Sequence, residues 1–429
     1  MRTRLLVAGS WVASIAGCGP TAGEVADASS GTSSSGAQTG DATGGGETTA
    51  PTGGETTAPT GGETTVDPMT TTDGTSTTTG SGDDDATGDA TAPAPPACDV
   101  VEIPDPALRA AIRAALEIPE GPISGEAMAT LTELAASGDE WYDLEGLECA
   151  VGLEWLSLAG AEYLPFSSEL DTISALPKLR RLSLAFTSVS DLTALAGLTT
   201  LETLDLEHTK VTDLAPLAGL TQLKTLEFPY TSVADLTPLA GLTALEKVVA
   251  SATKVADLTP LVGLTQLREL RLDDTDIADL GPLAKLTQLE QLHVGGTAVT
   301  DLAPLAGLLA LAGLGIENNA ITDLKPLTGL PITFLYAPGC KISDITPVAS
   351  FPTPGFMSLA FNLIEDLDPL LAADWYVEDD GCGLLDLSNN PLSVAALEEV
   401  IPTVCTETRL PILAEGAVCM GVLDCPGTY

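Results

Sequence analysis

Aromatic and basic residues are scarce in this sequence. Phe, Trp and Tyr make up 4% of its 429 residues, so the hydrophobic core must consist mainly of Leu, Val, Ile and Ala. Lys and Arg number 17 against 60 Asp and Glu, which gives a formal net charge of −43. The negative electrostatic field of such a chain argues against nucleic acid and anionic membrane surfaces as partners. The charge indicates either a solvated, solubilising surface, or a cationic partner or bound divalent cations.

The sequence also lacks the motifs of common enzymes. It contains no G-x-S-x-G, H-E-x-x-H or P-loop pattern, and its only histidines are His208 and His293. Its carboxylates recur at fixed spacings, where capping of turns explains them better than acid–base chemistry. We therefore expect a protein that is not an enzyme, with no cofactor and no metal site.

A repeat of 22 residues organises the chain from Leu179 to Leu330. The unit at 201–222 has the sequence LETLDLEHTKVTDLAPLAGLTQ, and we number unit positions from its first leucine. First leucines occur without slippage at Leu179, Leu201, Leu223, Leu245, Leu267, Leu289 and Leu311. This self-similarity is typical of a leucine-rich repeat solenoid.

The chemistry of one unit explains the pattern. Leucines at positions 1, 4 and 6 alternate with polar residues around a short strand, so one side is buried. Position 9 carries Thr, Asn or Cys, which can hydrogen-bond the backbone where the chain leaves the strand. Position 13 is Asp before Leu-x-Pro-Leu, which predicts the N-cap of a helical or 3₁₀ turn. Leu214, Leu217 and Leu220 are expected to fill the convex side of the core.

The N-terminus predicts export. Residues 1–18 place Arg2 and Arg4 before an apolar run that is too short to span a membrane, which is typical of a secretory signal. Ile15-Ala16-Gly17-Cys18 resembles the lipobox of bacterial lipoproteins, which implies cleavage before Cys18 and lipidation of its thiol. The alternative is an ordinary signal peptide with an incidental cysteine. Residues 19–97 are acidic and rich in Gly, Ser, Thr and Pro, which predicts a disordered linker or stalk.

The segment after Cys98 predicts a helical cap. IPDPALRAAIRAALEIP at 103–119 has apolar residues at helical spacing, and a second short helix is expected in GPISGEAMATLTELAAS. Together with the repeats, this segment resembles bacterial internalin-like leucine-rich repeat proteins of the 22-residue class. The resemblance covers about residues 100–395. It implies an exported, curved interaction module.

The expected fold is an α/β solenoid, a leucine-rich repeat arc. Its parallel sheet would line the concave face, with short 3₁₀ or helical turns on the convex face. The domains would be a signal peptide (1–18), the linker (19–97), a helical N-terminal cap (98–130), about twelve repeats (131–392) and a C-terminal cap (393–429). Irregular spacing predicts longer loops around Tyr163–Ser168 and Asp374–Gly381. The last segment predicts a helix and a cysteine-rich closing segment.

The eight cysteines fit an oxidising compartment. With Cys18 assigned to lipid and Cys340 expected as a free buried thiol at position 9, six disulfide candidates remain. A pair Cys98–Cys149 would staple the N-terminal cap. Cys382, Cys405, Cys419 and Cys425 allow three pairings, of which we favour Cys382–Cys405 with Cys419–Cys425. Zinc is the rival interpretation, but no C-x-x-C pair is present.

Positions 3, 5, 7 and 8 are expected to point out of the concave surface. His208 and His293 lie four repeats apart there, about 20 Å, so they cannot share a metal. Asp205, Glu207 and Glu227 could together offer oxygen ligands to Ca²⁺, although no calcium-loop sequence supports this. An acidic middle flanked by aromatic patches predicts a protein-binding groove. The candidate ligand-binding residues are Trp155, Phe186, Asp205, Glu207, His208, Glu227, Tyr230, Arg271, Asp273, Asp274, Tyr336 and Phe361.

These observations predict a monomeric, non-catalytic lipoprotein that binds a protein or other cell-surface ligand, cationic in one interpretation, through its concave face. We expect it at the bacterial outer membrane or cell surface, attached to the membrane only through its lipid. The alternative is a structural coat lipoprotein of the cell envelope without a specific ligand.

Overall fold

The computed structural model describes residues 98–136, 143–160, 167–377, 383–414 and 417–419. These residues belong to one unit of the chain, which is described here by itself. The signal, lipidation and linker predictions for residues 1–97 lie outside the described residues. No helix in the described ranges is both long and apolar enough to cross a membrane.

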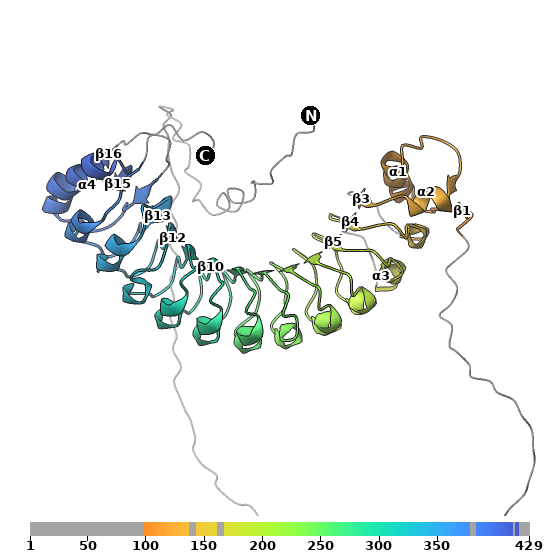
Figure 1. Cartoon of the computed structure of the whole chain (residues 1–429), viewed down its shortest axis with the longest axis horizontal. Helices are drawn as coiled ribbons and strands as arrows, with labels where there is room; N and C mark the ends of the chain where they lie inside the picture. Colours follow the sequence, from red (N-terminus) through yellow and green to blue (C-terminus); the bar gives the residue numbers. More distant parts are fainter. Residues whose placement is uncertain (1–97, 137–142, 161–166, 378–382, 415–416, 420–429) are drawn as a thin grey trace, which may run out of the picture. The chain divides into compact units, whose positions relative to one another are not determined.

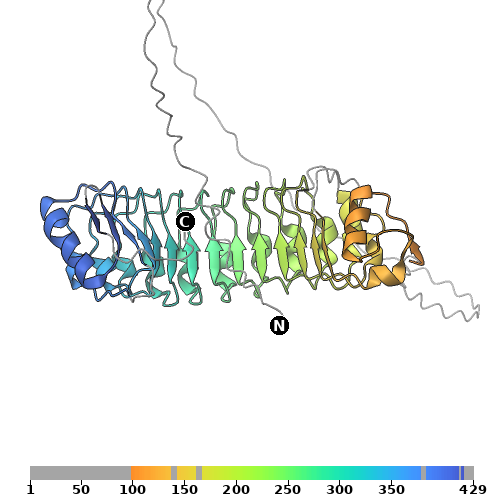
Figure 2. The same cartoon turned by 90° about the horizontal axis from the view of Figure 1, so that it is seen from above.

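The centre of the fold is a sheet of 14 strands that runs from β3 to β16 in chain order. Neighbours from β3 to β15 are parallel, and each unit contributes one short strand at positions 3–5 in register with the next. The strands are β3 (Glu133–Ala135), β4 (Trp155–Ser157), β5 (Arg181–Ser183), β6 (Thr203–Asp205), β7 (Thr225–Glu227), β8 (Lys247–Val249), β9 (Glu269–Arg271), β10 (Gln291–His293), β11 (Gly313–Gly315), β12 (Phe334–Tyr336), β13 (Phe356–Ser358), β14 (Leu385–Asp386), β15 (Ile412–Ala414) and β16 (Ala417–Cys419). The strands line the inner side of the curved repeats in Figure 1 and form one continuous row in Figure 2.

Short 3₁₀ turns form the outer side of the repeats, as the sequence predicts (Figure 1). In the regular unit, Asp213 Oδ1 accepts the backbone N–H of Ala215 at 2.8 Å and thereby begins the turn. The aspartate acts one residue before the position we expected, because Leu214 occupies the cap itself. The turns are η1 (Leu147–Cys149), η2 (Thr193–Gly197), η3 (Ala215–Gly219), η4 (Thr237–Leu239), η5 (Thr259–Gly263), η6 (Gly281–Lys285), η7 (Ala303–Gly307), η8 (Lys325–Leu327), η9 (Thr346–Ser350) and η10 (Asp368–Ala372).

The core lies between the strands and the turns. Leu214, Leu217 and Leu220 are buried, as predicted. Each buried leucine contributes about 1.5–3 kcal/mol of transfer free energy, and neighbouring units must supply the covering surface. Most position-9 residues are buried too, and they bond the backbone: Thr209 donates to Leu206 O at 2.8 Å. Cys340 is a free, buried thiol that donates to Ile316 O, as expected at this position.

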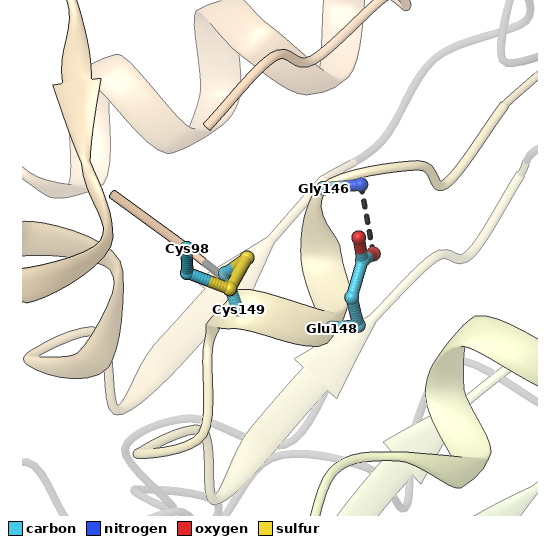
Figure 3. The surroundings of a disulfide bond; sticks show 4 residues. All are labelled: Cys98, Gly146, Glu148 and Cys149. Atoms are coloured by element: carbon cyan, nitrogen blue, oxygen red, sulfur yellow. Dashed lines mark hydrogen bonds between the residues drawn. A yellow bond between two sulfur atoms is a disulfide. The ribbon is translucent and has the colours of Figure 1, made fainter. Parts of the chain in front are cut away.

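The N-terminal end is closed by helices and a disulfide. A small hairpin, β1 (Val100–Val101) and β2 (Ile123–Ser124), accompanies α1 (Pro106–Ala115) and α2 (Gly125–Ala129). Cys98 and Cys149 form the predicted disulfide, which ties the start of the described chain to η1 (Figure 3). Beside it, the Glu148 carboxylate accepts the N–H of Gly146 at 2.8 Å. Gly146 has φ +94°, which favours glycine.

Two irregular parts of the solenoid differ from the sequence expectation. The long unit that starts at Leu153 contains a helix, α3 (Ser167–Ser174), which the sequence analysis does not predict. Most of the loop expected around Tyr163–Ser168 lies outside the described residues. At the other end, β15 adds a thirteenth parallel strand within residues 393–429, where we expected a helix and a closing segment as the C-terminal cap. It follows a short π-helix, η11 (Ala396–Val400), and helix α4 (Ile401–Thr408), and β16 then pairs with it antiparallel. The repeat pattern does not predict β15, because this strand lies outside the 22-residue period.

The C-terminal cysteines are only partly described. Cys405 in α4 is disulfide-bonded. Its partner lies outside the residues whose side chains the structure describes, so Cys382–Cys405 stays a prediction, as does Cys419–Cys425.

Candidate ligand-binding face

A row of left-handed residues follows the strands at position 8. We call it the turn row, and its φ angles lie between 52° and 70°. From Phe186 to Phe361, each backbone N–H in the row donates to a position-7 carbonyl of the next unit, for example His208 to Pro229 at 3.0 Å and Tyr230 to Ser251 at 2.9 Å. These bonds offset the cost of the left-handed conformation and leave the side chains in the row available for binding. The row consists of Phe186, His208, Tyr230, Ala252, Asp274, Gly296, Asn318, Gly339, Phe361 and Asn389.

Three rings of the turn row stack on one another. The Phe186 and His208 ring centroids lie 4.8 Å apart, and those of His208 and Tyr230 lie 4.3 Å apart with planes within 6° of parallel. We call these three residues the ring stack. Its two ends are open to solvent, since Phe186 is 50% and Tyr230 54% exposed. Exposed aromatic surface of this kind is what hot spots of protein interfaces use.

Carboxylates surround the ring stack. Asp205 accepts hydrogen bonds from the Ser183 hydroxyl at 2.8 Å and from the Glu207 backbone N–H at 3.1 Å. Burial raises the pKa of Glu207 above its usual value, and the charges of Asp205 and Glu227 raise it further, against the lowering influence of His208. Three acidic side chains from two neighbouring units therefore share one patch, and a cationic group would relieve their repulsion.

The middle of the strand face is less acidic than the sequence indicates. Lys247, which the sequence prediction omits, forms ion pairs with Glu227 at 2.9 Å and Glu269 at 3.6 Å. Arg271 pairs with Glu269 at 2.8 Å. The predicted acidic middle flanked by aromatic patches is thus wrong in detail. Charges at positions 3 and 5 neutralise one another, and the aromatic stack lies within the acidic region rather than beside it. Position 3, where Lys247 lies, carries charges along the chain and could have signalled this.

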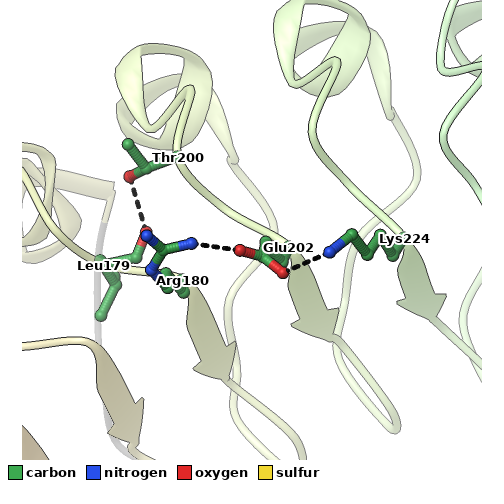
Figure 4. A network of polar contacts seen from close by, with 5 residues as sticks. All are labelled: Leu179, Arg180, Thr200, Glu202 and Lys224. Carbon is green, nitrogen blue, oxygen red and sulfur yellow. Dashed lines mark hydrogen bonds and ion pairs between the residues drawn. The ribbon is translucent and has the colours of Figure 1, made fainter.

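A second column of alternating charge runs along position 2. Glu202 bridges Arg180 and Lys224 of the units on either side, with Lys224 Nζ at 2.7 Å (Figure 4). The hydrogen bonds from Lys224 and Arg180 lower the pKa of Glu202. Arg268 and Glu290 pair in the same way further along. Many of the few Lys and Arg side chains therefore form ion pairs within the repeats. By contrast, no ion pair among the described residues includes Asp205, Glu207, Asp273 or Asp274.

A second aromatic group lies in the strands near the C-terminal end. Phe334 stacks on Phe356 with centroids 5.4 Å apart, and Tyr336 approaches Phe356 at 6.3 Å. Unlike the ring stack, these side chains belong to the strands, at positions 3 and 5, and are half-buried. The glycines of β11 provide room for their neighbours, since a Cβ at Gly315 would meet His293 Nδ1 at 2.6 Å.

Glu317 lies between the two aromatic groups. Burial raises its pKa to about 7, and the charges of Asp273 and Asp274 contribute. A side chain on Gly295 would overlap the Glu317 carboxylate, so the glycine provides the space into which Glu317 folds. Burial also lowers the pKa of His293. Among the described residues, no group of three or more His, Cys, Asp or Glu is arranged to hold a metal ion.

The remaining predicted site residues are scattered. Trp155 lies at position 3 near the N-terminal cap with the Arg181 guanidinium 6.0 Å from its ring. Phe361 is 61% exposed in the turn row, and its neighbours there are Gly339 and Asn389. Neither belongs to the ring stack or to the second aromatic group, which consists of Phe334, Tyr336 and Phe356. The structure therefore brings together Phe186, Asp205, Glu207, His208, Glu227 and Tyr230, followed by Arg271, Asp273 and Asp274 in the next units, and separates Trp155, Tyr336 and Phe361 from them.

Comparison with known proteins identifies the repeat family. A family model for leucine-rich repeats in two copies matches residues 177–219. The crystal structure of an internalin, InlF of Listeria monocytogenes, aligns with 76% of this chain and 99% of its own at 27% identity and a TM-score of 0.61. The chain is an internalin-like leucine-rich repeat protein. No curated protein matches this internalin-like chain.

Two further solved structures are similar to this internalin-like chain. A second internalin of the same species is 31% identical, covering 51% of this chain and 94% of its own, with a TM-score of 0.45. The plant peptide hormone receptor RGFR1, solved in complex with RGF2, is 17% identical and covers 68% of this chain and 52% of its own, with a TM-score of 0.52. The likeness to the receptor concerns the fold alone.

Proposed function

We propose that this internalin-like protein is a non-catalytic binding module that holds a protein or other cell-surface ligand on its strand side. The single observation that carries the proposal is the ring stack, which exposes three stacked rings beside Asp205, Glu207 and Glu227. Such side chains contribute nothing to the core, and aromatic anchors with selective charge are what interfaces use. The ligand is proposed to carry positive charge, because Asp205 and Glu207 form no ion pair with any residue in the described part of the chain.

The rigid backbone supports the same proposal. The turn row is held by a hydrogen bond in each unit, so its side chains are arranged before a ligand arrives. Preorganised surfaces lose less conformational entropy on binding. A relative of this fold, InlF, is an internalin, and a plant receptor with a similar solenoid was solved with RGF2.

The proposed location is the bacterial envelope. Export through residues 1–18, lipidation of Cys18 and a stalk formed by residues 19–97 would hold the repeats away from the outer membrane or cell surface. The protein is proposed to act as a monomer. This part is tested by membrane fractionation of Cys18→Ala, which should move the protein to the soluble fraction. If the variant still partitions into detergent, the anchor is not at Cys18.

A structural coat lipoprotein without a specific ligand is the second candidate. The alternating charges at position 2 favour it, because they regularise the solenoid without offering a site (Figure 4). A coat protein should tolerate changes anywhere on its surface.

Affinity capture separates the two functions. The soluble Cys18→Ala chain would be run against envelope and foreign-cell extracts beside a fourfold alanine variant of Glu207, Glu227, Tyr230 and Asp273. A matched control carries alanine at four exposed position-21 residues of the opposite side, namely Thr221, Thr243, Thr265 and Leu309. A ligand retained by the parent and the control but lost by the fourfold variant supports the binding module. Identical retention by all three, or none by any, supports the coat.

A further inference from the structure

The ring stack ends at Tyr230 because the next residue of the turn row is small. Its centroid steps of 4.8 and 4.3 Å follow the spacing of the units, about 4.8 Å between parallel strands. One step beyond Tyr230 the row carries only the methyl group of Ala252. His208 covers one face of the Tyr230 ring, and no ring in the described part of the chain stacks on the other. The row therefore leaves a gap above Ala252 that is open on one side to an aromatic face.

Two carboxylates lie on the far side of this gap. Asp273 accepts the Ser251 hydroxyl at 3.1 Å through Oδ2 and the Gly295 N–H at 3.0 Å through Oδ1, which fixes it next to the unit of Ala252. Asp274 is exposed in the turn row, and its carboxylate extends over Gly296. Tyr230 and Asp274 are two units apart, about 10 Å along the row. That distance accommodates one flat group stacked on the ring. Asp273 is already bonded to the unit of Ala252, whereas the Asp274 carboxylate lies over Gly296 and reaches the gap by rotation of its side chain.

We propose that the gap above Ala252 binds the guanidinium group of an arginine from a protein partner, stacked on Tyr230 and paired with Asp273 and Asp274. This rests on the proposed function and names the chemistry that the site selects. A guanidinium is flat, so it can lie parallel to a ring, and its edge donates to carboxylates. Lysine is rounder and more strongly hydrated, so it stacks less well. A neutral aromatic side chain would leave both carboxylates uncompensated.

The chain itself supplies a substitution that closes the gap. Ala252 has φ 55°, and phenylalanine occupies the same conformation at Phe186 (φ 58°) and Phe361 (φ 55°). Ala252→Phe therefore adds a fourth ring to the stack without new backbone strain and occupies the proposed arginine position. Ala252→Gly is the matched control, because glycine also occurs in the row, at Gly296 and Gly339, and leaves the gap open.

The two histidines provide the readout. His208 lies inside the ring stack, whereas His293 lies four units away, so their Hε1 resonances report the site and a remote control in one spectrum. The untagged full chain would be titrated at constant pH with N-acetyl-arginine amide and with its lysine, citrulline and phenylalanine counterparts. Arginine should shift the His208 signal saturably and leave His293 in place. Lysine should bind at least about 5-fold more weakly, and citrulline should not bind.

The variants decide whether the gap is the site. The arginine response should disappear in Ala252→Phe, persist in Ala252→Gly and weaken at least about 5-fold in the double variant Asp273→Asn/Asp274→Asn. Equal responses to lysine and arginine, movement of His293 together with His208, tighter binding of the phenylalanine amide, or an unchanged response in Ala252→Phe would each overturn the proposal.

Failure of this inference can be told from failure of the proposed function. If a ligand is captured through the ring stack while the arginine titration is flat, the binding module stands and the arginine site is wrong. If arginine binds as described while no extract yields a ligand, the site stands and the broader function is wrong.

Discussion

Phe228 and Tyr230 lie two residues apart in the same unit and have opposite surroundings. Phe228, at position 6, is 0% exposed, and Tyr230, at position 8, is 54% exposed. The same contrast separates position 9 from the position 8 before it in several units: Thr209 is buried beside the exposed His208, and Asn319 is buried beside the exposed Asn318. The solenoid therefore keeps residues for stability and residues for recognition in separate rows. A change in one row should leave the other intact.

The largest difference is expected within this pair of aromatics. Phe228→Ala removes a fully buried ring and should lower the free energy of unfolding by about 3–5 kcal/mol. Tyr230→Ala removes an exposed ring and should change it by less than about 0.5 kcal/mol. Denaturant unfolding of the two variants measures both values. Similar losses in the two would show that the ring stack is part of the core.

Glu317 is the exception to this separation, because it is an ionisable group of the recognition side that is largely buried. Its pKa of about 7 lies above the usual 4.5, so its protonated form is favoured in the folded state. The stabilisation that comes from keeping Glu317 protonated is fully present at pH values below about 4.5. It is lost as the pH rises to about 7, so the free energy of unfolding falls over this range.

Glu317→Gln should therefore match the parent near pH 4.5 and exceed it by about 2–3 kcal/mol at pH 8. Unfolding curves at pH 4.5, 6 and 8 test this, with Glu207→Gln as a control whose carboxylate is less buried. A constant difference across the series would mean that Glu317 ionises like an exposed carboxylate.

Position 9 should show a smaller effect than the core. Asn319 donates to Val294 O and accepts the Thr297 N–H, each at 2.8 Å. Asn319→Ala leaves the Thr297 N–H without its acceptor, although Val294 O still accepts the Thr297 hydroxyl at 2.8 Å, and it should cost about 1–2 kcal/mol. Asn318→Ala, one residue earlier in the exposed row, should be nearly neutral. Thermal unfolding of the two variants compares the rows directly, and a larger loss for Asn318→Ala would reverse the assignment.

The smallest effect is expected in the charged column. Glu202→Ala removes the bridge between Arg180 and Lys224, and all three side chains are partly exposed (Figure 4). Because solvent screens such pairs, Tm should fall by less than about 2 °C, and the difference should vanish in 1 M salt. A larger fall that persists in salt would mean that this column determines the fold.

The sequence predicts the buried rows better than the exposed ones. Leucines such as Leu217 and the position-9 residues Thr209 and Cys340 follow from the period, because the core repeats with it. The stacking of Tyr230 and the pairing of Lys247 do not, since both depend on the side chains of residues about 22 positions away, and these side chains vary. A row of Phe, His, Tyr, Asp, Asn and Gly at one position was a signal of the left-handed turn. The strand β15 was not predicted, because it follows the last unit of the 22-residue repeat.

The most direct test of the account places a photo-reactive residue in each row. A benzoyl-phenylalanine at Tyr230, in the ring stack, should cross-link to the captured ligand. The same residue at Leu309, which is 74% exposed near the 3₁₀ turn η7, should not. Cross-links from Tyr230 alone are the predicted result. Cross-links from Leu309 alone, or equally from both positions, would contradict the claim that recognition is located in the turn row.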